Sequence, residues 1–383
     1  MKTLAGLIQE KLATLDALQR RRRLRPLTDS RGLDLTHNDY MGLRGDPAFQ
    51  KRALAAAAPW PAGSGASRLL GGEHLIYDEV EQAFAAWKGA ESALYFPSGY
   101  AANEALMSAL HLGDAVYFSD EWNHASLIDG MRLARLRPEH KRIFRHNDCQ
   151  ELEQLLQDSR ARLKIIVVES LYSMDGDLCP ARELAALAQR YEAVLVVDEA
   201  HALGVYGPKG EGWMAAAGVS HDEYISVNPC GKAMAGSGAF ICGPSWLRDH
   251  LINTARSFIF TTGASPWAAA ALGESVRTMK TLDEQRRVFQ KRIVRVHEHL
   301  DALGFNKGAS ATHIIPIILG PEADALRAEA FCQERGVLAR AIRPPTVPEG
   351  SCRLRLSLHA GLTDADEERL KKVLSELAQK ILR

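Results

Sequence analysis

Five short apolar runs, separated by stretches with helical periodicity, dominate the middle of the chain. Each run is four to eight residues long, is rich in β-branched or aromatic residues, and is bounded by turn residues. Strands buried on both faces by crossover helices have this composition. The pattern therefore predicts an α/β domain with a mostly parallel sheet over residues 46–280. The five runs are SALYF, AVYFS, KIIVVES, AVLVVDEA and GAFICG.

A different pattern follows Thr281. Residues 283–304 place apolar side chains on one helical stripe that ends at Gly304, namely Val288, Phe289, Ile293, Val296 and Leu300. Strand-like HIIPIIL, a helix near 323–335, strand-like RLRLSL and a helix from Asp364 come next. These elements predict a smaller α+β domain over 281–383. The remaining segment, 1–45, is predicted to be a helix over 3–23 followed by an arm.

Composition excludes several classes of protein. A chain of 383 residues exceeds the usual limit of about 250–300 residues for one core, so a large domain with a smaller one is expected. A net charge of zero gives no field suited to nucleic acid. The six cysteines form no CxxC pair, so we expect reduced thiols and no metal site. The charged N-terminal stretch predicts no signal peptide or membrane span, and a cytoplasmic location.

Lys232 lies in a glycine-rich loop, within SVNPCGKAMAGSGAFICG, just before an apolar run. Burying an ammonium group is costly unless its pKa falls or it becomes a neutral imine. Lys232 is therefore a candidate to form a Schiff base with a carbonyl cofactor. The alternative is an ordinary lysine in a surface loop.

Asp198 comes at the end of the run VLVVD, and open α/β sheets bind ligands at the carboxyl ends of their strands. A protonated pyridine nitrogen is a suitable partner for such an acid, and the pair keeps the ring an electron sink. His201 could then reach the ring's phenolic oxygen, or could bond to the backbone of its own loop. The rival interpretation of Asp198 and Glu199, a metal-binding acidic pair, lacks an accompanying G-x-x-x-x-G-K-[ST].

The segment FPSGYAANEAL runs from a strand through Ser98, Gly99 and Tyr100 into a helix. Backbone N–H groups at such a helix start, with a glycine allowing close approach, make a phosphate cradle or simply a tight turn. His124 in NHASLIDG could stack on a planar cofactor, although a lone histidine is often structural. Together with Asp198 and Lys232, these features resemble the aspartate-aminotransferase-like class of pyridoxal-phosphate enzymes.

The chain resembles, over nearly its whole length, the α-oxoamine synthase family within that class. The shared motifs are THNDYMGL, GSGASRLLGG, FPSGYAAN, NHASLIDG, ESLYSMDGD, VDEAHALGVYG, CGKAMAGSGA, AIRPPTVPEG and RLRLSL. The resemblance implies an aspartate-aminotransferase-like (type I) fold and pyridoxal 5'-phosphate as cofactor. It also implies an enzyme that joins an amino acid to an acyl thioester with loss of CO₂ and free thiol.

The resemblance assigns roles to four residues. Lys232 would carry the cofactor and move protons, Asp198 would pair with the pyridinium nitrogen, His201 would contact the phenolic oxygen, and His124 would stack on the ring. Further cofactor contacts are implied at Gly99, Tyr100, Glu169 and Ser173, with Thr261 and Thr262 donated by a partner subunit. A homodimer with shared active sites is therefore expected.

The resemblance also implies substrate contacts at Asn38 and Arg355, and Arg22 and Thr346 are further candidates. Arg355 would grip the carboxylate of the amino acid, in keeping with the bidentate geometry of arginine. Arg22 and Arg23, in the basic run of Arg20, Arg21, Arg22, Arg23 and Arg25, are candidates for the far end of the acyl chain or the carrier's phosphates. A solvated basic face is the alternative.

Two positions depart from the family pattern. Pro229 stands three residues before Lys232, where the family usually has a phosphate-binding threonine, and Asn228 is a possible substitute. Tyr77 replaces a family histidine in the segment after GSGASRLLGG. Neither change removes an electron-sink or proton-transfer group.

The stretch AIRPPTVPEG resembles the version found in family members that join L-alanine to a pimeloyl thioester, carried by coenzyme A or acyl carrier protein. The consecutive prolines predict a stiff segment suited to walling a pocket. Three alternatives remain open. They are another reaction of the family such as glycine acetyl transfer, an aminotransferase without thioester chemistry, and a cofactor-dependent sensor, which has no DNA-binding module ahead of it here.

Overall fold

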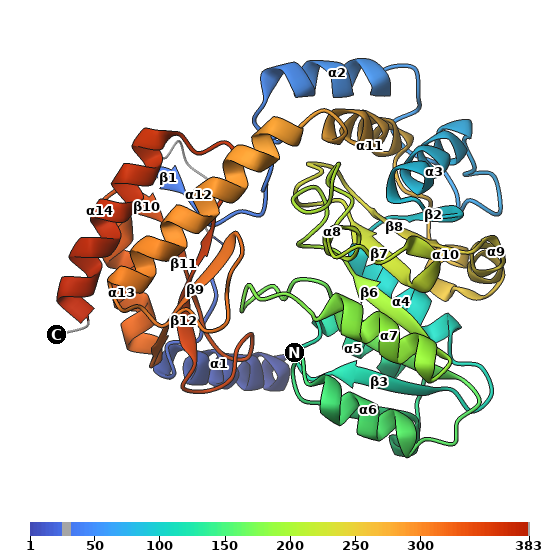
Figure 1. The fold of residues 1–383 in the computed structure, drawn as a ribbon, viewed down its shortest axis with the longest axis horizontal. Coiled ribbons are helices and arrows are strands. Elements are labelled where there is room, and N and C mark those ends of the chain that lie inside the picture. The colour runs from blue at the N-terminus through green and yellow to red at the C-terminus, as the bar shows by residue number, and fades with distance from the viewer. Residues whose placement is uncertain (25–31, 382–383) are drawn as a thin grey trace. The chain divides into compact units, whose positions relative to one another are not determined.

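The computed structural model describes residues 1–24 and 32–381, so Arg25 lies outside the described residues (Figure 1). The chain divides into two compact units. The large unit comprises residues 39–173 and 178–287, and the small unit comprises 1–38, 174–177 and 288–383. The three-part division at residues 45 and 280 stays a prediction. In the described part of the chain, no helix combines the length and apolar character that a bilayer span requires.

A seven-stranded sheet forms the centre of the large unit, in the order β2-β8-β7-β6-β5-β3-β4. The strands are β2 Ser92–Phe96, β3 Val116–Asp120, β4 Lys141–Phe144, β5 Lys164–Glu169, β6 Ala193–Asp198, β7 Ile225–Pro229 and β8 Ala239–Gly243. Only β8 runs antiparallel to its neighbours β2 and β7, and the other pairs are parallel. The predicted fold class and all five predicted strands are confirmed.

Helices cover both faces of this sheet. Ile165 and Val167 of β5 lie in a core cluster with α4 and α5, whereas Ile166 and Val168 lie in a second cluster with α6 and α7. Alternate residues of one strand are thus buried on opposite faces, which explains the uninterrupted apolar runs. The helices are α2 Pro47–Ala57, α3 Leu75–Lys88, α4 Gly99–Ala109, α5 Ala125–Leu133, α6 Cys149–Gln157, α7 Ala181–Arg190, α8 Trp213–Ala216, α9 Ser245–Thr254, α10 Arg256–Ile259 and α11 Pro266–Met279.

Two strands of the sheet, β4 and β7, were not predicted from the sequence pattern. β4 is an edge strand, and its sequence KRIF buries only Phe144 fully, so it lacks the apolar run that marks the inner strands. β7 ends in Pro229, and a proline argues against an inner strand. Pro229 is nevertheless accommodated because it is the last residue of the strand.

The small unit contains the α+β elements predicted after residue 281. Strands β9 Ile314–Gly320, β11 Arg340–Ile342 and β12 Cys352–Ser357 form an antiparallel sheet, and β1 Leu33–Asp34 pairs with β10 Val337–Leu338. The helices are α1 Lys2–Ala17, α12 Asp283–Ala302, which starts in the large unit, α13 Glu322–Glu334 and α14 Asp364–Ile381.

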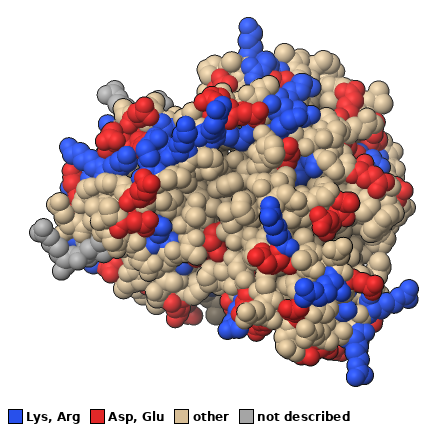
Figure 2. All heavy atoms as spheres, viewed as in Figure 1, with Lys and Arg blue, Asp and Glu red and all other residues tan. Residues whose placement is uncertain are grey.

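The stripe predicted on α12 is correct except at its first position. Phe289, Ile293, Val296 and Leu300 are at most 1% exposed, whereas Val288 is 43% exposed. Val288 is adjacent to Phe289 along the chain, and neighbouring helical residues point about 100° apart, so both cannot face the core. Lys and Arg side chains form a band where α12 lies in the view of Figure 2.

The first helix is shorter than predicted. It ends at Ala17 rather than at residue 23, and Gln19 adopts a left-handed backbone conformation with φ of 54°. Arginine favours helix, so the basic run looked like its last turn. Instead, Arg20 forms ion pairs with Glu322 at 2.6 Å and with Glu349 at 3.0 Å, which fix the chain after the turn.

Candidate active site

A cavity of about 220 Å³ lies in the large unit, at the carboxyl ends of β5 and β6. Parallel sheets bind ligands at this edge because helix starts and loops gather there. Seven of the residues proposed from the sequence or its resemblance line the cavity, namely Gly99, Tyr100, His124, Glu169, Asp198, His201 and Lys232, and so does Pro229, the departure from the family pattern. Asn103, Ser126 and Ala200 complete its wall.

Lys232 lies in the loop that connects β7 to β8. Backbone hydrogen bonds from Gly236 to Cys230 and from Cys230 to Gly238 close this loop at 3.0 and 2.9 Å. A Cβ on Gly236 would lie 2.2 Å from Cδ2 of Leu272, so a larger residue there would force the buried Leu272 to shift. The loop therefore holds Lys232 on a rigid base.

The amine of Lys232 belongs to a chain of polar contacts. Its Nζ lies 2.9 Å from Nε2 of His201, and Nδ1 of His201 lies 2.6 Å from the hydroxyl of Tyr40. Tyr40 is fully buried, so it holds the imidazole from the protein side. This arrangement keeps His201 beside the lysine amine, at a distance suited to proton exchange.

Asp198 is the last residue of β6 and is 4% exposed. Its Oδ2 accepts a hydrogen bond from Asn103 Nδ2 at 2.7 Å, and its Oδ1 accepts one from the Ala200 N–H at 2.9 Å. A carboxylate has about four acceptor sites, so these two bonds leave room for a donor from within the cavity. The site suits a cationic or N–H-bearing group.

Glu169 ends β5 in register with Asp198 on β6, so two acids stand side by side at the sheet edge. Burial raises the pKa of Glu169 well above its usual range, and the neighbouring Asp198 raises it further, while Lys232 acts in the opposite direction. Two adjacent buried carboxylates repel each other, so the protonated form of Glu169 is favoured more strongly than it is in water.

The turn at the start of α4 has the features of an anion site. Ser98 caps the helix by accepting a hydrogen bond from the Ala101 N–H at 3.1 Å, and Gly99 is the first helical residue. A Cβ on Gly99 would lie 2.7 Å from Cγ of Pro229, so the proline requires a glycine here. The hydroxyl of Tyr100 donates to Asp129. First-turn N–H groups point out of a helix and suit phosphate.

His124 is the N-cap of α5. Its Nδ1 accepts a hydrogen bond from the Ser126 N–H at 3.2 Å and lies 2.7 Å from the Ser126 hydroxyl. The residue is exposed, but desolvation lowers the pKa of its ring; Asp198 opposes this effect and Lys232 adds to it. The neutral form of the ring is therefore favoured.

Three residues expected to contact the cofactor do not line the cavity: Ser173, Thr261 and Thr262. The two threonines follow α10, in a loop fastened by hydrogen bonds from Gly263 N to Ala66 and from Ser64 Oγ to Gly263. Their expected role belongs to a partner subunit and stays a prediction.

The two departures from the family pattern have structural explanations. The hydroxyl of Tyr77 donates to the Ala264 carbonyl, so this residue holds the loop that carries Thr261 and Thr262. The buried amide of Asn228 donates to Ser226 Oγ at 2.9 Å and to the Phe240 carbonyl at 3.2 Å. That amide is committed to the strands and does not line the cavity.

Glu199 has a structural role that separates it from Asp198. Its carboxylate accepts hydrogen bonds from the N–H groups of Trp213 and Met214 at 3.0 and 3.2 Å, and Lys88 lies 3.9 Å away. Glu199 therefore fixes the start of α8. The two acids do not act as a pair on one ligand.

The four expected substrate residues lie in the small unit and form two pairs. Arg355 on β12 donates from Nη1 to Asn38 Oδ1 at 3.1 Å. Arg22 donates from Nη2 to the Thr346 hydroxyl at 2.8 Å. Both pairs join residues more than 300 positions apart in sequence. Arg23 is exposed.

The sequence reasoning missed Asn103, Ser126 and Tyr40. Asn103 lies four residues after Gly99, one turn along α4 and on the same face, so helical spacing was a usable signal. Ser126 lies two residues after His124, at the start of α5, where polar side chains often bond to the cap. Nothing in the local sequence connects Tyr40 to His201.

Comparison with known proteins agrees with this geometry. The family model for class I and II aminotransferases matches residues 30–374. The chain belongs to this family. A putative 8-amino-7-oxononanoate synthase from Geobacillus kaustophilus is 43% identical over 87% of this chain and 85% of its own length. The 8-amino-7-oxononanoate synthase from Anaeromyxobacter dehalogenans is 42% identical over 92% and 90%.

Solved structures extend the comparison. A serine palmitoyltransferase variant from S. paucimobilis with bound PLP and myriocin is 26% identical, with a TM-score of 0.89 over 99% of this chain and 98% of that one. The 8-amino-7-oxononanoate synthase from Francisella tularensis is 26% identical, with a TM-score of 0.79 over 92% and 99%. The resemblance to the α-oxoamine synthases and the type I fold are confirmed.

Proposed function

We propose that this chain is a pyridoxal-phosphate enzyme that condenses L-alanine with a pimeloyl thioester. The products are 8-amino-7-oxononanoate, CO₂ and the free thiol of the carrier, a step of biotin synthesis. The relatives that carry this name are 40–43% identical over most of the chain. The observation that carries the proposal is the cavity that brings Lys232, His201 and Asp198 together.

The residues present fit pyridoxal phosphate. Lys232 supplies the amine for covalent attachment, and Asp198 supplies a buried acceptor for the ring nitrogen. His201 is suited to the phenolic oxygen, His124 to the ring face, and the turn at Gly99 and Tyr100 to the phosphate. When bound, the cofactor supplies an electron sink for charge at the Cα of the amino acid.

The proton steps fall to this chain's own groups. Lys232 takes the proton from Cα and later returns one, and His201, 2.9 Å from Nζ, is placed to relay it. Asp198 accepts hydrogen bonds from Asn103 and the Ala200 N–H, which suit its carboxylate form. This negative charge stabilises the cationic ring nitrogen on which the electron sink depends.

The substrate roles are proposed for the two pairs of the small unit. Arg355, oriented by Asn38 and Ser357, binds the carboxylate of the amino acid. Arg22 with Thr346 binds the polar far end of the pimeloyl chain or the carrier's phosphates. Thr261 and Thr262 complete the phosphate site of a second subunit. The active form is then a homodimer, and sedimentation should show a dimer that loses activity on dilution.

A long-chain acyl thioester is the second candidate substrate, because serine palmitoyltransferases are similar in fold at TM-scores of 0.88 to 0.89. The test is to measure thiol and CO₂ release with pimeloyl, acetyl and palmitoyl thioesters, each with alanine, glycine or serine. The pimeloyl and alanine pair should have the highest specificity constant, and the gene should restore growth without biotin to a strain lacking this step. A preference for palmitoyl with serine, or acetyl with glycine, without restored growth, would reject the proposal.

A further inference from the structure

A chain of hydrogen bonds links Asp198 to His124 through two side chains, Asn103 and Ser126. We infer that these two are positioning residues, which hold the His124 imidazole neutral with its only ring proton on Nε2. The inference rests on the proposed function only in giving His124 a place against the cofactor. The hydrogen bonds themselves fix the proton's position.

Asp198 determines the orientation of the Asn103 amide. Its Oδ2 lies 2.7 Å from Asn103 Nδ2, and a carboxylate oxygen can only accept. The amide must therefore turn its NH₂ group toward Asp198, since the reverse orientation would place two acceptors face to face. The Ala200 N–H, which can only donate, bonds to the other oxygen of Asp198 at 2.9 Å, in keeping with an acceptor carboxylate.

Asn103 has a second N–H on the same nitrogen. Nδ2 lies 2.8 Å from Ser126 Oγ, so both amide hydrogens are used at once. The Oδ1 of Asn103 is buried and has no hydrogen-bond partner among the residues that the structure describes. A buried unsatisfied carbonyl oxygen is unfavourable, and its presence here indicates that the orientation is imposed by the two acceptors on Nδ2.

Ser126 acts as a hydrogen-bond donor to the His124 imidazole. Its oxygen accepts from Asn103, so its single hydrogen is available for Nδ1 of His124 at 2.7 Å. The backbone N–H of Ser126, which can only donate, also points at Nδ1, at 3.2 Å. An Nδ1 that accepts from both donors carries a lone pair, so the ring proton is on Nε2.

The consequence is a defined donor in the cavity wall. A neutral ring protonated on Nε2 offers one N–H to an oxygen of a bound ligand, whereas the other tautomer would offer a lone pair and repel it. The same bonds restrain the rotation of the ring about its side chain. Ser126 is 1% exposed, and so is Asn103, so the bond between these two side chains is shielded from solvent.

The direct test is nitrogen-15 NMR of the histidine rings in the full chain, without cofactor and with pyridoxal phosphate. The chain has 13 histidines, so the His124 signals are assigned by their loss in His124→Asn. We expect a protonated Nε2 and an unprotonated Nδ1 near pH 7. A protonated Nδ1 in the unaltered protein would overturn the inference.

Two variants test the chain of bonds from opposite ends. Ser126→Ala removes the hydroxyl, and Asn103→Leu removes both amide donors but keeps Ser126. Each should shift His124 toward a mixture of tautomers, and Ser126→Thr should restore the Nε2–H form. If Asn103→Leu leaves the tautomer unchanged while it remains folded, Asn103 has no part in the relay.

The cofactor gives a second readout. We expect Ser126→Ala to bind pyridoxal phosphate about two- to tenfold more weakly, with a smaller circular dichroism of the bound chromophore, because one hydrogen bond is lost. Ser108→Ala is the matched control, since the Ser108 hydroxyl bonds only to the Glu104 and Ala105 carbonyls of the same helix. Equal effects of the two variants would contradict the positioning role.

These measurements separate the inference from the proposed function. The tautomer of His124 is measured in cofactor-free protein and does not depend on any substrate. A protein that shows the Nε2–H form but binds no pyridoxal phosphate would retain the inference and reject the function.

Discussion

Glu169 in the large unit and Glu367 in the small unit are equally buried, at 3% exposure, yet their carboxyl groups behave in opposite ways. Burial and the neighbouring Asp198 raise the pKa of Glu169. The pKa of Glu367 falls to about 2, chiefly because Arg295 donates to it, with help from Lys371 and Arg292. Burial alone therefore does not decide the charge of an acid, and the surrounding groups do.

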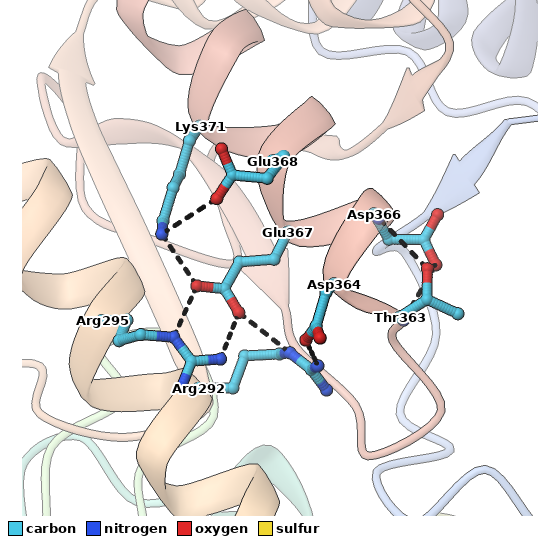
Figure 3. A network of polar contacts seen from close by, with 8 residues as sticks. All are labelled: Arg292, Arg295, Thr363, Asp364, Asp366, Glu367, Glu368 and Lys371. Atoms are coloured by element: carbon cyan, nitrogen blue, oxygen red, sulfur yellow. Dashed lines mark hydrogen bonds and ion pairs between the residues drawn. The ribbon is translucent and has the colours of Figure 1, made fainter.

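Figure 3 shows how the small unit achieves this. Arg292 and Arg295 from α12 and Lys371 from α14 converge on the Glu367 carboxylate, at 3.1, 2.5 and 2.8 Å. The network joins two helices and lines no cavity among those found in the described residues. At the sheet edge of the large unit, by contrast, two acids share a cavity with one lysine. The first arrangement serves stability and the second serves chemistry.

The largest effect is expected at the cavity, for Lys232→Ala. Turnover should fall about 10⁴-fold or more, since both the covalent anchor and the proton carrier are lost. Thiol release measures turnover, and borohydride reduction followed by peptide mapping should place the cofactor on Lys232 in the parent protein. Lys209→Ala, in a loop of the same unit, is the control and should retain activity. An adduct on another lysine would contradict the assignment.

Asp198→Asn should reduce turnover by roughly 10²–10³-fold with little change in the unfolding temperature, because its charge matters most in the transition state. The same substitution removes the negative neighbour of Glu169, so the pKa of Glu169 should move down toward its usual range. Steady-state kinetics measures turnover, and thermal unfolding measures the unfolding temperature. Near-normal turnover would show that a different group serves the ring nitrogen.

Glu367→Gln should produce the reverse pattern. The free energy of unfolding should fall by about 3 kcal/mol, since the buried Arg292 loses its buried carboxylate partner and keeps only the exposed Asp364. Specific activity of the folded protein should be unchanged. Urea unfolding followed by fluorescence measures the stability, and Glu368→Gln, an exposed neighbour on α14, is the control. Lost activity at unchanged stability would break the comparison between the two units.

The pH dependence of stability should differ in sign between the two acids. Glu367 has a lowered pKa. Its contribution to the free energy of unfolding is therefore complete above the usual pKa of a glutamate and is lost as the pH falls from about 5 toward 2. Glu169 has a raised pKa. Its contribution to the free energy of unfolding is therefore complete at low pH and is lost as the pH rises through this raised pKa. Unfolding of Glu367→Gln and Glu169→Gln beside the parent protein, at several pH values, tests both signs. Parallel curves for the two variants would contradict the opposite shifts.

The sequence predicted the inner strands well because burial on both faces leaves continuous apolar runs. The edge strand β4 has no such run, and the length of α1 was misjudged because arginine favours helix while the ion partners of Arg20 lie more than 300 residues away. Both errors depend on contacts that the local sequence does not contain.

The residues of the candidate site also divide into those that the sequence predicted and those that it did not. Asp198 could be placed because open α/β sheets bind ligands at the carboxyl ends of their strands, whereas Glu169, which ends the neighbouring strand in register, was expected only from the family resemblance. Asn103 and Ser126 act through other side chains, and their importance appears only once α4 and α5 are packed together. Tyr40 meets His201 across 161 residues, a contact that only the folded chain defines.

The close fit of Pro229 against Gly99 sets the distance between the end of β7 and the start of α4. The proline ends the strand that leads to Lys232, and the glycine begins the helix whose first turn faces the cavity. The rigid pyrrolidine ring acts as a spacer between the amine and the anion-binding turn, two points that a ligand must reach at once. The contact between Pro229 and Gly99 thus limits how closely the segment that carries Lys232 and the start of α4 can approach each other.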